Sequence, residues 1–127
     1  MADVNRGSRP LSPHLMIYRP QWTSISSIFT RITGNALILA GLMAVWWFIA
    51  LASGPEAYAR ANGVITSWFG DLVMALSVWA AWYHLIFGVR HLIWDSGRML
   101  DVDQSEHYAM VGVIASVLLT VFTIIVV

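Results

Sequence analysis

The chain has 127 residues, of which 58% are hydrophobic and 11% are charged, and its mean hydropathy of +0.69 is too high for a soluble domain of this size. A formal net charge of zero argues against a nucleic-acid partner, because such proteins present a basic surface. Without cysteine, the chain cannot form disulfides, carry out thiol catalysis or ligate a cluster through sulfur on its own.

The N-terminal stretch, MADVNRGSRPLSPHLMIYRP, has no apolar run long enough for a secretory signal, and its prolines at positions 10, 13 and 20 disfavour a helix. We therefore predict that residues 1–30 form a cytoplasmic segment. The chain is expected to enter a bacterial inner membrane through its own first span.

Three later stretches are apolar enough to cross a bilayer, and we predict transmembrane helices at 31–53, 64–94 and 107–127. The uncharged run from Ile32 to Ala52 would span about 30 Å as a helix. The last stretch is rich in β-branched residues, but in lipid each backbone group must bond within its own segment, which favours helix. The predicted fold is all-α, a single membrane-anchor domain over 1–127 with three transmembrane helices.

Two connections join these spans. The first breaks at Gly54 and Pro55 and continues into EAYARA, which we interpret either as a helix along the membrane surface or as an ordinary loop. The second, HLIWDSGRMLDVDQSEHYA, is polar enough for a solvent-exposed loop that follows a second span bounded by Asp71 and Arg90.

The arginines predict the orientation, because basic residues are retained on the cytoplasmic side. Six lie in or next to the N-terminal segment and the second connection, and only Arg60 lies in the first connection. The six are Arg6, Arg9, Arg19, Arg31, Arg90 and Arg98. The N-terminus and the second connection are therefore expected in the cytoplasm.

A histidine lies inside the second apolar span, in the stretch HLIFGVRHLIWD that starts at His84. An ionisable side chain at this depth is costly and usually faces a partner inside the helix bundle. Two interpretations stand: a neutral imidazole bonded to a neighbouring helix, or an axial haem ligand. Gly88 follows on the same face and would let a flat macrocycle approach the backbone. Because this chain has no equally good ligand in another span, a bis-histidine haem would need a second protein.

Ser27 and Arg31 are four residues apart in SISSIFTRITG, so on a helix they share one face with Gly34. One interpretation is a capped helix start with an arginine reaching the lipid headgroups. The other is a hydroxyl and a guanidinium directed at a small polar group, such as a quinone carbonyl or a haem propionate.

Three motifs in order, RPLSPHLMIY, SSIFTRITG and HLIFGVRHLIWD, resemble the cytochrome b membrane-anchor subunit of succinate dehydrogenase, respiratory complex II. The resemblance covers the whole chain. It implies haem b, ubiquinone as electron acceptor, a flavoprotein subunit, an iron-sulfur subunit and a second small anchor subunit that packs around the haem and supplies its other axial ligand. It also implies that this chain does not oxidise succinate alone.

The resemblance assigns roles to five residues. His84 matches the axial ligand of the haem iron; Ser27 and Arg31 match the quinone site, with Arg31 also near the haem propionates. His91 and Asp95 match positions near the haem and the quinone region. The sequence departs from the family at Thr30, where many members have a propionate-binding histidine.

Alternatives remain for the function and for the N-terminal motif. The chain could anchor a fumarate reductase, or it could be a structural anchor without haem. A small transporter is disfavoured, because paired charges are missing from the apolar runs. The motif RPLSPHLMIY either docks against the iron-sulfur subunit or forms a disordered tail, and His14 within it is interpreted as structural.

Overall fold

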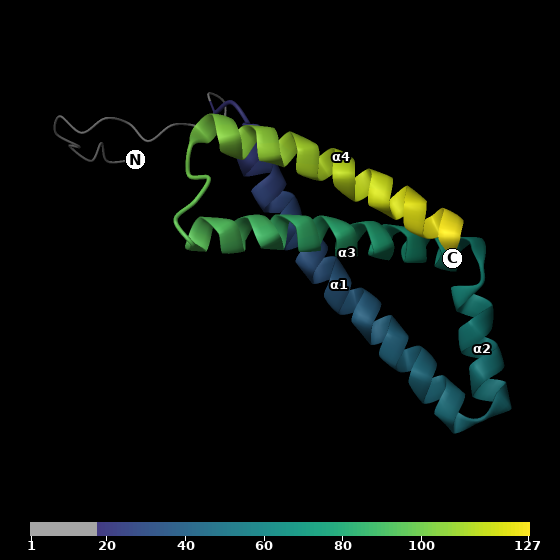
Figure 1. The fold of residues 1–127 in the computed structure, drawn as a ribbon. Helices are drawn as coiled ribbons and strands as arrows, with labels where there is room; N and C mark the ends of the chain where they lie inside the picture. Colours follow the sequence, from purple (N-terminus) through teal and green to yellow (C-terminus); the bar gives the residue numbers. More distant parts are fainter. Residues whose placement is uncertain (1–17) are drawn as a thin grey trace, which may run out of the picture.

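A computed structural model describes residues 18–127, which form four helices (Figure 1). They are α1 (Trp22–Ser53), α2 (Pro55–Ile65), α3 (Trp68–Asp95) and α4 (Val102–Val126). Helices α1, α3 and α4 are long and apolar enough to cross a membrane, which confirms the predicted three-helix, all-α membrane anchor. Most of the motif RPLSPHLMIY lies outside the described residues, His14 included.

Helix α1 begins well before the span predicted at 31–53. Gln21 is its N-cap residue, and Ser24 Oγ accepts from the Gln21 amide at 3.1 Å and donates to the Gln21 carbonyl at 2.9 Å. The helix tolerates the hydroxyl-rich stretch that follows because these side chains donate to carbonyls of their own helix, as Thr30 does to Ser26 at 2.8 Å. The predicted span followed the apolar run and began at Arg31, whereas the helix begins nine residues earlier, at Trp22.

Helix α2 confirms the helical interpretation of EAYARA; whether it lies on the membrane surface stays a prediction. Gly54 has φ 118°, a value that favours glycine, and Pro55 follows at the first helical position. The predicted span at 64–94 includes the end of α2, because the chain turns before Ser67 caps α3 by accepting from the Gly70 amide at 3.2 Å.

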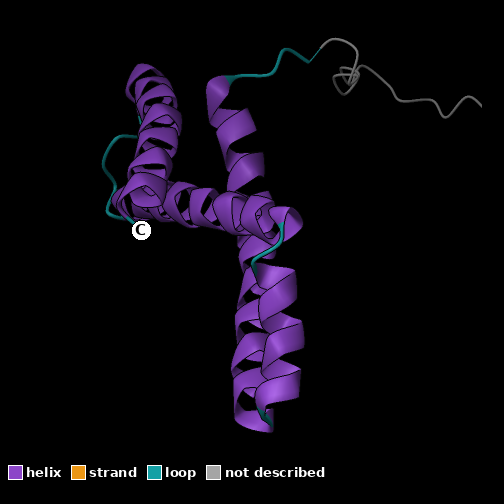
Figure 2. Cartoon of the chain, turned by 90° about the vertical axis from the view of Figure 1, so that its right-hand side faces the viewer, coloured by secondary structure: helices purple, strands orange, loops and turns teal. Residues whose placement is uncertain are grey.

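Helix α3 packs against both α1 and α4, as two views at right angles show (Figures 1 and 2). Tyr83, Phe87 and Ala109 form the buried apolar core. Polar bonds add to the α3–α4 contact: Trp82 Nε1 donates to Thr123 Oγ1 at 2.9 Å, and Trp79 donates to Ser116 at 3.2 Å. In a membrane such bonds join helices whose apolar side chains gain little over contact with lipid.

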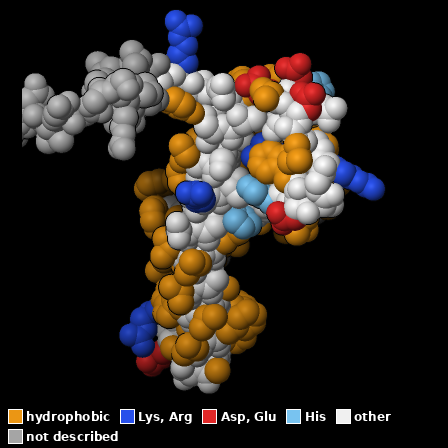
Figure 3. All heavy atoms as spheres, turned by 90° about the vertical axis from the view of Figure 1, so that its left-hand side faces the viewer, with side chains coloured by type: hydrophobic (Ala, Val, Ile, Leu, Met, Phe, Trp, Pro, Cys, Tyr) orange, Lys and Arg blue, Asp and Glu red, His pale blue; other side chains and the backbone are white. Residues whose placement is uncertain are grey.

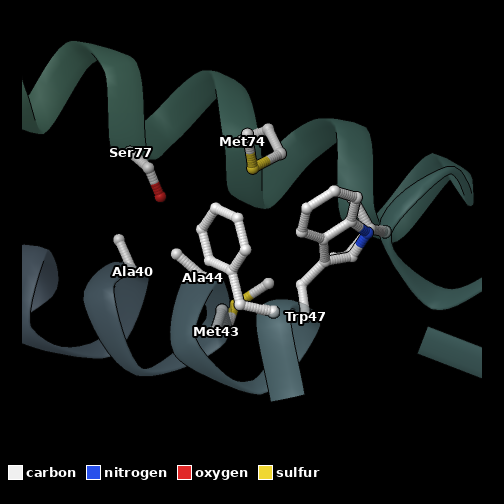
Figure 4. Close-up of a pocket in the computed structure, with 8 residues that line it drawn as sticks. Ala40, Met43, Ala44, Trp47, Met74 and Ser77 are labelled. Atoms are coloured by element: carbon white, nitrogen blue, oxygen red, sulfur yellow. The ribbon is translucent and has the colours of Figure 1, made fainter. Parts of the chain in front are cut away.

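Helices α1 and α3 cross and then diverge toward α2, which closes the wide end of the triangle (Figure 1). An apolar groove of about 310 Å³ lies between them there, with the ring of Trp47 opposite Met74 (Figure 4). None of the predicted site residues lines it. Large apolar side chains are exposed along all three long helices, as expected for surfaces that meet lipid or partner subunits.

Candidate functional site

The imidazole of His84 lies where α3 crosses α1. Its Nδ1 is 2.9 Å from the backbone carbonyl oxygen of Thr30 and 3.4 Å from Thr33 Oγ1. The Thr33 hydroxyl already donates to its own helix at Phe29, so the carbonyl is the main partner. If Nδ1 carries the proton and donates to this carbonyl, Nε2 keeps a free lone pair.

A glycine makes this approach possible. A Cβ built on Gly34 would come within 3.0 Å of His84 Cε1 and 3.4 Å of Nδ1, closer than side chains normally pack. At Gly88, one turn beyond His84 on α3, a Cβ would meet no atom within 4 Å. The face of α3 that carries His84 therefore contacts α1 at Gly34, and it is open one turn further on, at Gly88.

The surroundings of His84 fit what a haem ligand requires in one respect. A metal-ligating histidine usually donates its other ring N–H to a carbonyl or carboxylate, which fixes the tautomer, and His84 has this arrangement with Thr30. Within residues 18–127 no group of three His, Cys, Asp or Glu side chains could hold a metal ion. The geometry fits one axial ligand to a macrocycle-bound iron. A neutral imidazole that only packs against α1 would make the same bond, which is therefore common to both interpretations of His84.

Ser27 and Arg31 lie on α1 beside this contact. Ser27 is half-buried and Arg31 is exposed, and at helical spacing they share a face with Gly34, which contacts His84. In the described part of the chain, neither the Ser27 hydroxyl nor the Arg31 guanidinium makes a hydrogen bond. Helix α1 is capped at Gln21, so the prediction that the helix starts at these residues is wrong. The alternative that Arg31 reaches the lipid headgroups stays a prediction.

His91 is half-buried one turn before the end of α3. Its Nδ1 is 2.7 Å from the Phe87 carbonyl, and its ring meets the edge of Trp94 at 5.3 Å. Figure 3 shows two histidine side chains and an arginine on this face of the molecule. Asp95 is exposed at the last residue of α3 and, within residues 18–127, forms no bond with the other predicted site residues.

Thr30 contacts His84 through its main-chain carbonyl. Its hydroxyl donates to the Ser26 carbonyl at 2.8 Å and is buried, while its own carbonyl faces His84. A threonine hydroxyl has a single proton, so none remains for a propionate. The departure from the family at Thr30 therefore bears on propionate binding and not on the contact with His84.

Arg90 has a buried position that its place at the predicted end of the second span did not indicate. It lies within α3, its side chain is 0% exposed, and Nη1 donates to Ser26 Oγ at 3.0 Å. Its place on the cytoplasmic side stays a prediction. Helical spacing carried a signal, because Tyr83, Phe87, Arg90 and Trp94 follow the i, i+4, i+7, i+11 pattern of a buried stripe.

Comparison with known proteins identifies the family of the chain. The family model described as succinate dehydrogenase/fumarate reductase transmembrane subunit matches residues 5–125. The succinate dehydrogenase cytochrome b556 subunit of Paracoccus denitrificans is 47% identical over 99% of this chain and 97% of its own length. The b556 subunit of Rickettsia conorii is 40% identical over 89% of this chain and 88% of its own.

A third relative extends the range of sources: the succinate dehydrogenase cytochrome b560 subunit of Reclinomonas americana is 35% identical over 93% of this chain and 83% of its own length. The range of the family model, residues 5–125, contains α1 and α3 and all but the last residue of α4. The chain belongs to the family of succinate dehydrogenase and fumarate reductase transmembrane subunits, and it is therefore a membrane subunit of an oxidoreductase complex.

Proposed function

We propose that this chain is the haem b-binding anchor subunit of a succinate:ubiquinone oxidoreductase, with His84 as an axial ligand of the haem iron. The observation that carries the proposal is the likeness over nearly the whole chain to relatives named cytochrome b556 subunits. The bond between His84 Nδ1 and the Thr30 carbonyl at 2.9 Å is compatible with it, because it leaves Nε2 for a metal. The open space at Gly88 supports it, because a flat group can approach α3 there. Haem b, when bound, would supply a one-electron carrier.

The second axial ligand would come from a second small anchor subunit. The described residues offer a single well-placed histidine at the crossing, and α1 and α3 leave broad apolar faces exposed. A neighbouring pair of helices would cover such faces and enclose the other side of the macrocycle. The iron-sulfur and flavoprotein subunits would bind at the end of the molecule that holds the start of α1.

Ser27 and Arg31 would form part of the ubiquinone site. A neutral hydroxyl and an exposed guanidinium on one face can both donate to a quinone carbonyl, and the interaction strengthens as negative charge develops on that oxygen during reduction. Arg31 would also lie near the haem propionates. His91 and Asp95 would lie at the edge of the same region, His91 with Nε2 free after its bond to Phe87.

The chain would lie in a bacterial inner membrane with its N-terminus in the cytoplasm. The start of α1 and the connection from α3 to α4 lie at the same side of the fold (Figure 1), as required if both face one compartment. Among the arginines of residues 18–127, Arg60 on α2 is at the opposite end from this side. Excess positive charge near the cytoplasm then gives the orientation.

A reduced-minus-oxidised optical spectrum of the purified complex tests haem ligation. We expect a b-type α-band that is lost or shifted in His84→Ala and unchanged in His107→Ala, because His107 is exposed at the start of α4. An unchanged spectrum in His84→Ala would place the ligand elsewhere. If the native complex has no haem band, the structural anchor without haem becomes the better account.

Activity measurements test the quinone site. Ser27→Ala or Arg31→Ala should lower ubiquinone reduction by about 10²-fold, the usual cost of removing one donor to developing charge. Succinate oxidation by soluble artificial acceptors should stay the same, since it requires neither residue. Arg60→Ala removes an arginine from the opposite end and is the matched control. Equal loss of both activities in Ser27→Ala or Arg31→Ala would contradict the assignment.

The family also contains fumarate reductase subunits. We propose succinate oxidation because the relatives compared above are named succinate dehydrogenase subunits. Comparing succinate oxidation by quinone with fumarate reduction by quinol in the same purified complex gives the direction that the complex favours.

A further inference from the structure

A guanidinium is enclosed between α3 and α1, away from the proposed ligand face. Arg90 is fully buried, and its Cζ lies 4.6 Å from the ring centre of Phe87 and 4.4 Å from that of Trp94. These aromatic faces offset part of the cost of desolvating the cation. Within residues 18–127 its Nε and Nη2 have no hydrogen-bond partner, so Nη1 makes its one bond, to Ser26 Oγ at 3.0 Å.

Ser26 receives more than this one contact from α3. Its carbonyl accepts from the Tyr83 hydroxyl at 3.1 Å and from the Thr30 hydroxyl at 2.8 Å, while its own hydroxyl donates to the Thr23 carbonyl at 3.0 Å. Two α3 side chains thus bind one α1 residue: Tyr83 binds the main-chain carbonyl of Ser26, and Arg90 binds its side-chain hydroxyl. Ser26 is 1% exposed, so no solvent competes for these bonds.

Helix geometry separates this cluster from the proposed haem. Arg90 follows His84 by six residues, which places it about 120° away around α3. On α1, Ser27 is adjacent to Ser26 and therefore lies about 100° around that helix. The bonds to Ser26 consequently fix how α1 is rotated, and the rotation decides where Ser27 and Arg31 point.

We propose that Arg90 and Tyr83 are positioning residues that hold α1 through Ser26 in the rotation that presents Ser27 and Arg31 to the quinone. This inference rests on the proposed quinone site. A buried cation without a carboxylate partner is costly, and an apolar side chain would pack between helices at lower cost. Directional bonds to one serine supply what apolar packing does not, namely a defined rotation of α1 near its N-terminus.

The test uses the assembled complex and measures the KM for a short-chain ubiquinone and the kcat, with the rate expressed per mole of haem. Tyr83→Phe removes one bond and keeps the ring, so the KM should rise about fivefold, the equivalent of one hydrogen bond. Arg90→Met should give a similar or larger rise. Arg90→Lys, which keeps a donor able to reach Ser26, should restore part of it. The α-band and the soluble-acceptor rate should remain those of the native complex.

Thr123→Val is the matched control, because it also removes one hydrogen bond made by α3, from Trp82 at 2.9 Å, but on the side of α4. A role limited to stability would lower the yield of complex in all variants and leave the quinone KM unchanged. An unchanged KM in Tyr83→Phe and in assembled Arg90→Met would overturn the proposal. If the complex with Arg90→Met does not assemble, the KM of Tyr83→Phe decides the test.

The parent proposal has its own outcome in the same assay. If Ser27→Ala and Arg31→Ala leave ubiquinone reduction intact, the quinone site itself is wrong. If they impair it while Tyr83→Phe has no effect on the KM, the site stands and only the positioning role fails.

Discussion

His84 on α3 is oriented by the main chain of α1, because its Nδ1 lies 2.9 Å from the carbonyl oxygen of Thr30. A backbone carbonyl is present whatever the side chain, so the contact depends on the helical course of α1 and on the space left at Gly34. The side chain at position 30 has a different task, as its hydroxyl bonds to Ser26.

Thr30→Val should therefore leave haem ligation intact. Valine has nearly the shape of threonine and keeps the Thr30 carbonyl in place, while it loses the bond to Ser26 at 2.8 Å. Because that bond is short-range and within one helix, the stability of the complex should fall by about 1 kcal/mol at most. Optical spectra and a thermal melt measure the two quantities. Loss of the α-band in Thr30→Val would contradict an orientation of His84 by the carbonyl.

Gly34→Ala should disturb the proposed haem site. Its Cβ would lie 3.0 Å from His84 Cε1, so the imidazole must move by a few tenths of an ångström or more. We expect a shifted α-band or midpoint potential in the redox titration of the complex. Gly41→Ala on the same helix is the control, since a Cβ there meets nothing within 4 Å and slightly favours the helix. If the two variants gave identical redox titrations, the absence of a side chain at Gly34 would not be required for the position of His84.

Gly112→Leu should loosen the contact between α3 and α4. A Cβ at Gly112 already lies 3.1 Å from Phe87 Cζ and 3.2 Å from Ile86 Cγ2, and leucine adds bulk to this buried position. Overpacking of this kind costs about 1–3 kcal/mol, so the thermal midpoint of the complex should fall. Gly63→Leu, at an exposed position of α2 with open space, should leave it unchanged. A higher midpoint for Gly112→Leu would contradict the close packing.

Single cysteines test the proposed orientation, because the chain has none of its own. Ala59 on α2 and Gln104 on α4 are both exposed and uncharged. A membrane-impermeant thiol reagent should label Ala59→Cys in intact spheroplasts and Gln104→Cys only after lysis, read as a mass shift of this subunit. The opposite pattern would place the N-terminus outside the cytoplasm.

Local rules predicted the helices well. The three apolar runs formed helices, and the break at Gly54 and Pro55 separates α1 from α2. These features depend on backbone bonding within each segment and on residues that interrupt it, both of which can be recognised from a few neighbouring residues. Helix α1 extends beyond the predicted span at its N-terminal end, because serine and threonine side chains there bond to carbonyls of their own helix.

The candidate site was predicted in part. The pattern at His84 indicated a buried ligand or a packed imidazole, and the motifs led to the family that the comparisons confirm. The carbonyl of Thr30 as its partner was not predictable, because the partner is a main-chain atom on another helix. The roles of Ser27, Arg31, His91 and Asp95 stay predictions.

A three-span membrane anchor of the succinate dehydrogenase and fumarate reductase family could be predicted from the amino-acid sequence, because apolar length and helix breaks act locally and the motifs are continuous in the chain. The burial of Arg90 and its contact with Ser26 could be found only from the packing of the helices. Those two residues are far apart in the chain, and which polar groups pair across helices depends on how the helices cross. A charge in an apolar run marks the surface only when no neighbouring helix covers it.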